Sequence, residues 1–244
     1  MPTTPAQPAS GAPIEPLLIE AKPTISYTRP DQVEKQKRLD ALLARYEKEA
    51  PHQHFVTDHH NIVFGEGDPC AKLMFIGEAP GAEEDRVGRP FVGRSGQLLD
   101  KMIQALGLRR QDVYIANVMK TRPPNNATPT LDECMKCAPY LFEQVAIIRP
   151  EAIVTLGLPA TRTVLNSADS MTNLRGRWAT LATPSFMGVE AFSSPVMPTY
   201  HPAFLLRAYT KENRQKVWSD LQMAAKKIGV APAAAGASAD AAGD

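Results

Sequence analysis

The sequence predicts an α/β fold: a three-layer α/β/α architecture with a central, mostly parallel four-stranded sheet. Short apolar runs alternate with segments of helical periodicity, which is typical of a parallel sheet covered by helices on both faces. Polar residues follow several of the apolar runs, at the sheet edge where α/β folds bind ligands. In chain order, the alternating strands and helices are expected at 71–77, 97–107, 112–119, 131–148, 151–156, 158–166, 195–200 and 211–228.

A helix is expected ahead of this core, at residues 31–49. Apolar side chains recur on one side of it, and Asp31, after Pro30, is its expected N-cap. The next segment, 51–60, is polar and holds four of the five histidines. Residues 167–194 have no clear periodicity, and we expect only short strands there, around Trp178 and Phe192.

Length and composition favour one sizeable domain. The chain has 244 residues, of which 43% are hydrophobic, enough for a full core. Residues 1–28 and 230–244 are rich in small residues without periodicity, and we expect both to be disordered tails. The predicted domain is therefore 29–229.

Charge and cysteine content limit the function classes. The formal net charge is +1, so binding of nucleic acid needs a local basic patch. Three cysteines suggest a reducing compartment without a disulfide framework. No apolar stretch is long enough to cross a membrane, and the first residues lack a signal-peptide pattern. We expect a cytoplasmic monomer without a membrane partner.

The segment from Gly77 to Gln97 is the most informative part of the chain. It follows an apolar run and precedes a helical one, and it is rich in Gly, Pro and carboxylates. Such a segment suits a ligand site at the carboxyl end of a strand. The alternative is a long, solvated acidic turn.

Two further polar residues, Asn117 and His201, each end an apolar run. Both have an ordinary alternative: Asn117 as the cap of a strand end, and His201 as a structural histidine. Phe91, in the glycine-rich segment, has the alternative of a core anchor.

Taken together, three motifs resemble the family-four uracil-DNA glycosylases. The resemblance runs from about Asn61 to Lys227 and includes the order and spacing of the motifs. The motifs are Gly77-Glu78-Ala79-Pro80-Gly81 with Gly88-Arg89-Pro90-Phe91-Val92-Gly93, then Asn117-Val118-Met119-Lys120 with Arg122-Pro123-Pro124-Asn125-Asn126, and finally His201-Pro202-Ala203 with Leu205-Leu206-Arg207.

This resemblance implies a monofunctional enzyme of base-excision repair that hydrolyses the N-glycosidic bond of uracil in DNA and leaves an abasic site. Phe91 would stack on the flipped base, and Asn117 would pair with its N3–H and O4. His201 would donate to O2 as negative charge develops there. Glu78 and Glu84 match positions linked to activity. Two other readings stay open: a glycosylase for another deaminated base, such as hypoxanthine or xanthine, and a catalytically weak DNA-binding relative.

The resemblance implies further contacts to the substrate. Gly77, Ala79 and Asn125 match positions beside the base or sugar, and Ala79 stands where the best-known uracil glycosylases have a water-orienting aspartate. The DNA backbone would meet basic side chains and the start of a helix. These candidates are Arg89, Arg94, Ser95, Gln97, Lys120, Arg122 and Arg207.

The cysteines depart from the family, whose members typically hold an iron–sulfur cluster with four of them. Thr121 stands at one cysteine position, and only Cys137 has a clear match. Because a cubane cluster normally needs four thiolates, we predict no cluster, no other cofactor and no metal. The alternative is a zinc site built from Cys134, Cys137 and two of the histidines in 51–60.

Overall fold

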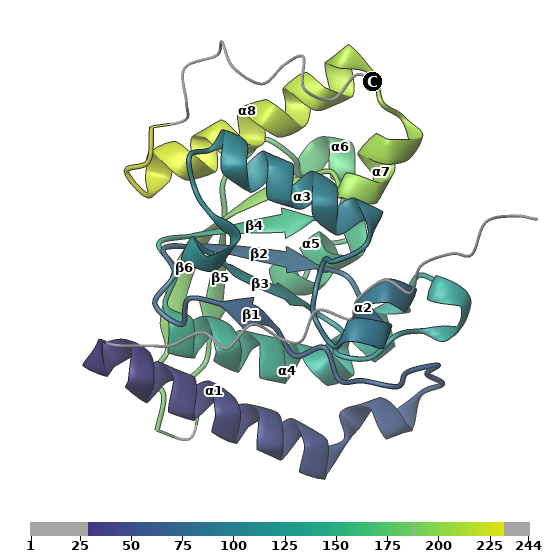
Figure 1. The fold of residues 1–244 in the computed structure, drawn as a ribbon, viewed down its shortest axis with the longest axis vertical. Coiled ribbons are helices and arrows are strands. Elements are labelled where there is room, and N and C mark those ends of the chain that lie inside the picture. The colour runs from purple at the N-terminus through teal and green to yellow at the C-terminus, as the bar shows by residue number, and fades with distance from the viewer. Residues whose placement is uncertain (1–28, 187, 232–244) are drawn as a thin grey trace, which may run out of the picture.

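A computed structural model describes residues 29–186 and 188–231 of the chain (Figure 1). The tails expected at 1–28 and 230–244 lie outside the described residues, apart from positions 230 and 231.

The described residues form one mixed sheet of six strands in the order β1-β3-β2-β4-β6-β5. Its centre is parallel: β3, β2, β4 and β6 run in the same direction, and they are the four strands expected from the sequence. Two short strands at the edges, β1 and β5, pair antiparallel and bring the total to six. The strands are β1 (Glu66–Gly67), β2 (Leu73–Gly77), β3 (Tyr114–Asn117), β4 (Ala152–Leu156), β5 (Ala179–Thr183) and β6 (Phe192–Thr199).

Helices cover both faces of the sheet, as Figure 1 shows. Alternate residues of the buried strand β2 point to opposite faces: Met74 and Ile76 pack into one core cluster, and Leu73 and Phe75 into the other. The first cluster includes α4 and α5, with α1 packed outside α4; the second includes α3, α7 and α8. The helices are α1 (Pro30–Glu49), α2 (Ala82–Val87), α3 (Arg94–Ala105), α4 (Leu131–Ile148), α5 (Leu158–Leu165), α6 (Met171–Leu174), α7 (Pro202–Arg207) and α8 (Lys211–Lys227), with 3₁₀ turns at Pro51–His54, Arg110–Asp112 and Pro124–Asn126.

The helices depart from expectation mainly at four places, and the first is α6, in a segment where we expected only short strands. Helix α1 has Arg29 as its N-cap and Pro30 in the first turn, so the expected N-cap at Asp31 is wrong; proline favours this first position because it needs no hydrogen-bonded N–H. The glycine-rich segment contains a short helix, α2, where we expected only loop. Helix α3 begins at Arg94, three residues before the expected start at 97.

In the part of the chain that the structure describes, no helix is both long and apolar enough to cross a membrane.

Candidate active site

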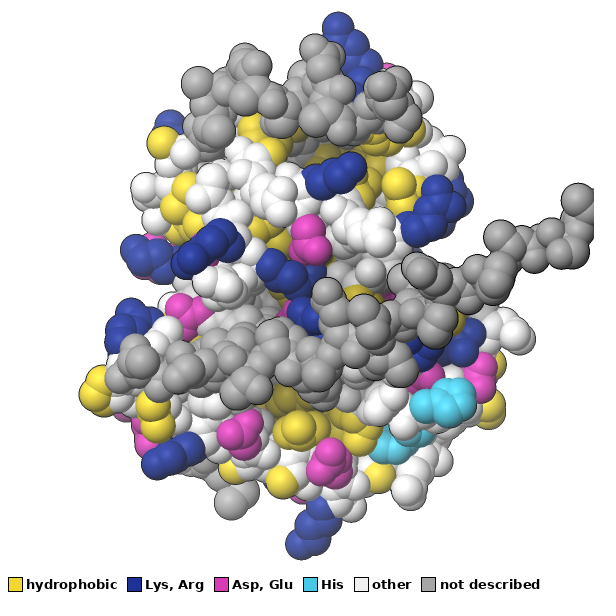
Figure 2. Space-filling view, in the orientation of Figure 1, with side chains coloured by type: hydrophobic (Ala, Val, Ile, Leu, Met, Phe, Trp, Pro, Cys, Tyr) yellow, Lys and Arg dark blue, Asp and Glu magenta, His cyan; other side chains and the backbone are white. Residues whose placement is uncertain are grey.

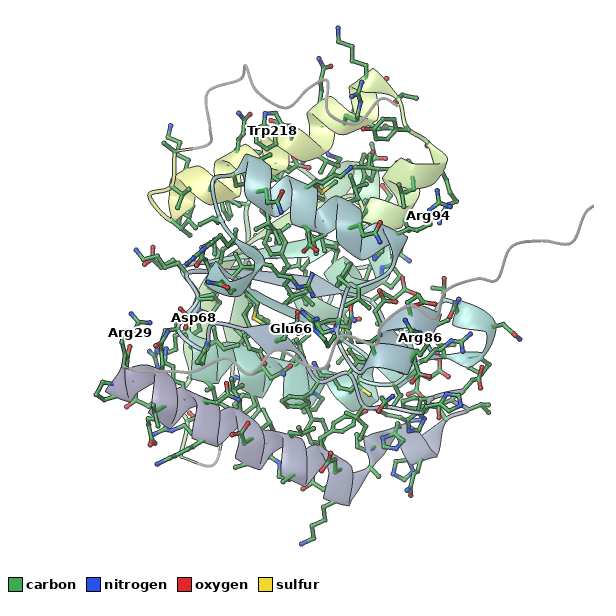
Figure 3. The ribbon with its side chains drawn as sticks, viewed as in Figure 1. Arg29, Glu66, Asp68, Arg86, Arg94 and Trp218 are labelled. Atoms are coloured by element: carbon green, nitrogen blue, oxygen red, sulfur yellow. The ribbon has the colours of Figure 1, made fainter. Side chains whose placement is uncertain are left out.

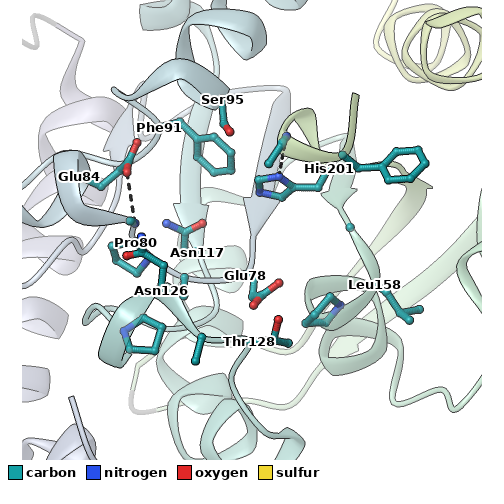
Figure 4. A pocket seen from close by; sticks show the side chains of 18 of the residues that line it. Glu78, Pro80, Glu84, Phe91, Ser95, Asn117, Asn126, Thr128, Leu158 and His201 are labelled. Carbon is teal, nitrogen blue, oxygen red and sulfur yellow. Dashed lines mark hydrogen bonds between the residues drawn. The ribbon is translucent and has the colours of Figure 1, made fainter. Parts of the chain in front are cut away.

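A cavity of about 630 Å³ opens at the carboxyl ends of the parallel strands. It brings the three predicted segments together: Glu78 follows β2, Asn117 ends β3, and His201 follows β6 (Figure 4). The wall between them comes from the segment after β4, which begins at Gly157. The lining residues are Glu78, Ala79, Pro80, Gly81, Glu84, Phe91, Ser95, Asn117, Pro123, Asn126, Ala127, Thr128, Gly157, Leu158, Pro159, Met171, Tyr200, His201, Ala203, Phe204 and Arg207.

Phe91 forms one aromatic wall of the cavity. Its ring lies 5.6 Å from the His201 ring, centroid to centroid, with 30° between the planes. The backbone of Phe91 has φ of 51°, in the left-handed region, which costs on the order of 1–3 kcal/mol for a residue with a side chain. The surrounding structure holds this conformation: Arg110 donates to the carbonyl oxygens of Pro90 and Phe91. A flat ring fixed in this way is suited to stacking on a planar base.

Gly77 is needed for the packing of this wall. It pairs with Asn117 across β2 and β3, so the two residues lie side by side at the strand ends. A Cβ atom at Gly77 would lie 2.3 Å from Asn117 Oδ1 and 2.5 Å from Phe91 Cζ. Gly77 therefore acts as a support under both side chains and does not itself line the cavity.

Asn117 presents an amide to the cavity from a buried position, with only 1% of its surface exposed. Its backbone is held by two neighbours: the Val118 N–H donates to Gly77 O, and Lys120 Nζ donates to Asn117 O. Its side-chain oxygen, however, is buried without a hydrogen-bond partner among the described residues. Leaving a buried acceptor unpaired costs about 1–3 kcal/mol, so this atom is prepared for a donor supplied by a ligand.

His201 is the N-cap of α7, with Pro202 at the first helical position. Its Nδ1 accepts a hydrogen bond from the Ala203 N–H at 3.0 Å, so the neutral ring carries its proton on Nε2. Burial, with a smaller contribution from the nearby Arg207, lowers the pKa of His201 to about 4. Gly157 leaves room for it, because a Cβ there would lie 3.0 Å from the His201 Cβ. The cavity thus contains a neutral hydrogen-bond donor at physiological pH.

The two predicted carboxylates have different environments. Burial raises the pKa of Glu78 to about 7, and Glu78 lines the cavity beside Ala79. Glu84 also lines it, but its carboxylate accepts from three backbone N–H groups: Val92 and Gly93 at 2.8 Å and Gly81 at 3.2 Å. Glu84 therefore ties the loop before α2 to the loop that carries Phe91, and Glu78 is the carboxylate suited to proton transfer.

Two basic residues expected at the DNA backbone are held elsewhere. Lys120 is fully buried and donates to Asn117 O and Gln144 Oε1, so the expectation that it contacts DNA is corrected: its ammonium does not reach the surface. Arg89 pairs with Glu66, and its side chain is 15% exposed and outside the cavity lining.

The other predicted backbone contacts lie nearer the surface. Arg207 lines the cavity and is exposed. Arg94 is exposed at the N-terminus of α3, on the side of α7 (Figure 3). Ser95 lines the cavity, and its N–H lies in the first turn of α3. The Gln97 N–H is already bonded to Gly93 O, because the helix starts earlier than expected. Figure 2 shows basic and acidic side chains interspersed over the face it presents, in keeping with the near-neutral net charge.

The loop after β3 places Asn126, and not the expected Asn125, in the cavity lining. Both residues have φ of 54°, and this pair of left-handed residues turns the chain so that neighbouring side chains diverge. Arg122 holds the loop by donating to Asn126 Oδ1 at 2.8 Å and pairing with Asp58 at 3.3 Å. Arg122 is thereby engaged within the protein.

Sequence reasoning missed the wall formed by Leu158, Pro159 and Met171, and the role of Arg110. The signal available was position alone: Gly157 follows the buried strand β4, so the residues after it belong to the same sheet edge as the recognised motifs.

Cys134 and Cys137 are neighbours on one side of α4, and Cys70 lies apart from both. Cys137 is buried beside Tyr46, 4.0 Å from Sγ to the hydroxyl oxygen, near the C-terminal end of α1. Cys70 lies against Asp31 at the other end of that helix, and Asp31 is 15 residues, or about 22 Å along the helix axis, from Tyr46. Within 29–186 and 188–231, no group of three or more His, Cys, Asp or Glu side chains is arranged to hold a metal ion.

Comparison with known proteins identifies the family. Residues 64–222 match the model of the uracil DNA glycosylase superfamily. The type-4 uracil-DNA glycosylase of Thermotoga maritima is 43% identical over 165 residues, covering 67% of this chain and 81% of that protein. Those of Archaeoglobus fulgidus (42% over 175 residues, 69% and 81%) and Pyrobaculum aerophilum (41% over 152 residues, 60% and 74%) are also similar. The matched region contains every cavity-lining residue described above, and the chain belongs to the uracil-DNA glycosylase superfamily.

Proposed function

We propose that this protein hydrolyses the N-glycosidic bond of uracil in DNA and leaves an abasic site for base-excision repair. The observation that carries the proposal is the unpaired, buried side-chain oxygen of Asn117, in a cavity that also contains Phe91 and the neutral donor His201. The similarity to type-4 uracil-DNA glycosylases supports the same reaction.

Recognition in this scheme depends on the Asn117 amide. A uracil rotated out of the duplex would stack on Phe91, with its N3–H donating to Asn117 Oδ1 and its O4 accepting from Nδ2. Cytosine presents an acceptor at N3 and a donor at C4, so the same fixed amide would face two mismatched pairs. A fixed amide therefore selects against the undamaged base.

Bond cleavage then uses two groups, one acting on the leaving uracil and one on the attacking water. As the C1′–N1 bond breaks, its electron pair moves onto uracil, and the Nε2–H of His201 stabilises the charge at O2. A water molecule adds its oxygen to C1′ and gives a proton to the Glu78 carboxylate. No lysine is among the residues that line the cavity, which supports hydrolysis without a covalent Schiff base and without strand cleavage.

Binding of the DNA backbone is assigned to the surface around the cavity. Arg94 and Arg207 are exposed there, and the N-terminal turn of α3, with Ser95 in the cavity lining, is suited to a phosphate. Fewer basic residues are assigned to the DNA backbone than the motifs contain, because Lys120 and Arg89 bind groups within the protein.

We also propose that the protein works as a monomer without an iron–sulfur cluster. The residues present do not fit the four-thiolate cluster of the family: Thr121 stands at one ligand position, and Cys70 contacts Asp31 at one end of α1 while Cys137 contacts Tyr46 near the other end. Around Cys137, packing by Tyr46 and its aromatic neighbours Phe64 and Tyr140 supports the fold instead.

The decisive experiment is an excision assay with five oligonucleotides that differ at one position. That position holds uracil, hypoxanthine, xanthine, thymine or cytosine. We expect the uracil oligonucleotide to break after alkali treatment, and we expect no strand breaks in it without alkali. Excision of hypoxanthine or xanthine alone would replace the proposed substrate, and DNA binding without any excision would point to a catalytically weak relative. His201→Ala provides the matched inactive protein.

A further inference from the structure

Lys120 is the most unusual charged residue outside the cavity lining. It is fully buried, with its Nζ 5.2 Å from the centroid of the Phe64 ring. No carboxylate is among the hydrogen-bond and ion-pair partners found for it in the described residues. A buried lysine without an acidic partner is costly, so its hydrogen bonds must offset the cost of burial.

The hydrogen bonds of Lys120 lead directly to the base-reading residue. Its Nζ donates to the backbone oxygen of Asn117 at 2.7 Å and to Gln144 Oε1 at 2.6 Å. Gln144 is itself fixed from α4, because its Nε2 donates to Phe64 O at 3.0 Å. A continuous chain of contacts therefore runs from the buried side of α4 to the residue that presents an amide to the cavity.

The hydrogen bond from Lys120 to Asn117 O lies at the end of strand β3. Asn117 is the last residue of β3, and its neighbours Val118 and Met119 donate their N–H groups to Gly77 O and Glu78 O. The Asn117 carbonyl is instead held by the Lys120 side chain. Without that donor, a buried carbonyl would be unpaired at the one peptide group that carries the base-reading side chain.

We propose that Lys120 is a positioning residue that fixes the Asn117 amide for base recognition, and that it is not a contact to DNA. The proposal rests on the proposed function only for its kinetic consequence. Burial lowers the pKa of the Lys120 amine to about 7, and the neutral and the charged amine both have the two hydrogens that these bonds use. The positioning role therefore persists on either side of neutral pH.

The test compares Lys120→Met and Gln144→Met with the exposed control Lys101→Met in single-turnover excision at saturating protein. Because a misplacement of 1 Å can cost about 10²-fold, we expect Lys120→Met to lose roughly 10- to 100-fold in the excision rate constant. We expect Gln144→Met to lose several-fold, and the double variant to lose no more than Lys120→Met, since both act through one contact. Affinity for DNA without uracil, and the salt dependence of that affinity, should stay within twofold of wild type, because the base-reading amide takes no part in backbone binding.

Other results would overturn the assignment. A folded Lys120→Met protein with an excision rate within twofold of wild type would show that Lys120 does not position Asn117. Weaker DNA binding with a shallower salt dependence would make Lys120 a phosphate contact after all. If Lys120→Met does not fold, Gln144→Met decides, and a wild-type rate in that variant refutes the proposal.

A readout that needs no activity separates this proposal from the proposed function. In ¹⁵N-labelled protein, the side-chain amide resonances of Asn117 should shift and broaden in Lys120→Met or Gln144→Met, and stay unchanged in Lys101→Met. Unchanged Asn117 resonances would refute the positioning role. Absence of excision by wild-type protein, with the resonances shifted as expected, would refute the proposed function and leave the positioning role standing.

Discussion

The pH dependence of excision tests the role of Glu78 most directly. Burial raises the pKa of this carboxyl group to about 7, well above the ordinary value of about 4.3 for glutamate. If the carboxylate accepts the proton of the attacking water, the rate follows its ionised fraction. That fraction is about one half at pH 7, about one tenth at pH 6 and about one hundredth at pH 5, so the rate should fall roughly tenfold per unit below pH 7. A glutamate with an ordinary pKa would give an almost flat profile down to pH 5.

His201 does not obscure this profile, because its pKa of about 4 keeps it neutral over the same range. The measurement is a single-turnover rate constant at each pH, with protein in excess over a uracil oligonucleotide. Glu78→Gln should lower the plateau by roughly 10²-fold or more and remove the dependence below pH 7. Glu83→Gln is the matched control, since Glu83 is exposed, pairs with Arg86 and lies outside the cavity lining. A wild-type rate constant that does not change between pH 8 and pH 5 would refute the reasoning. A Glu78→Gln protein whose rate constant still falls below pH 7 would also refute it.

The same substitution should also stabilise the fold. Because the pKa of Glu78 is higher in the folded than in the unfolded chain, the folded state binds more protons between about pH 4.3 and pH 7. The contribution of Glu78 to stability is therefore present below that window and is lost as the pH rises through it. At pH 8, Glu78→Gln should raise Tm and lower activity together, the pattern expected of a group retained for chemistry. An unchanged or lower Tm would show that burial of this carboxylate is not costly.

The remaining predictions concern recognition, DNA binding and metal content. His201→Ala should lower the single-turnover rate by roughly 10²–10³-fold with the fold intact by circular dichroism, as expected for the loss of one donor to a developing anion; near-wild-type turnover would remove it from the mechanism. Asn117→Asp should lose uracil excision and gain at most weak activity on cytosine, because a carboxylate supplies only acceptors; unchanged selectivity would make Asn117 a strand cap. Arg207→Gln should weaken DNA binding and reduce the log–log salt slope by about 0.9, the value for one phosphate contact, and an unchanged slope would exclude that contact. Elemental analysis should find no stoichiometric iron in a colourless protein, since Cys137 alone matches a cluster ligand; one cluster per chain would overturn this prediction, and one zinc per chain would favour the cysteine–histidine site.

Much of the architecture follows from apolar periodicity and from where the periodicity stops. The four central strands and the long helices α4 and α8 were predicted because buried strands and amphipathic helices have distinct apolar patterns. The edge strands give a weaker signal: β1 has two residues, and β5, expected only as a short strand around Trp178, has Leu181 as its one large apolar residue. Short edges depend on their neighbours for pairing, so their own sequence contains little of the signal.

The positions that line the cavity were predicted where a motif ends a strand, as at Glu78, Asn117 and His201. Prediction failed by one residue at Asn125, because two successive left-handed residues reverse the direction of the side chains there. Backbone angles of this kind are favoured in asparagine, but the sequence does not say which of two adjacent asparagines points inward.

The roles of charged residues near the strand ends are the hardest to predict from the sequence, and the reason is physical. A charge near a strand end has two uses: it can face the substrate, or it can hold a backbone group that the strand leaves unpaired. Glu84 holds N–H groups around Phe91, Arg110 holds carbonyl oxygens at the same residue, and Lys120 holds the carbonyl of Asn117. Each of these bonds fixes a residue that contacts the base in our proposal, and a side chain used in this way is not available to the DNA. Residue type and spacing are the same in both cases, so only burial and partner geometry separate a substrate contact from the support that positions it.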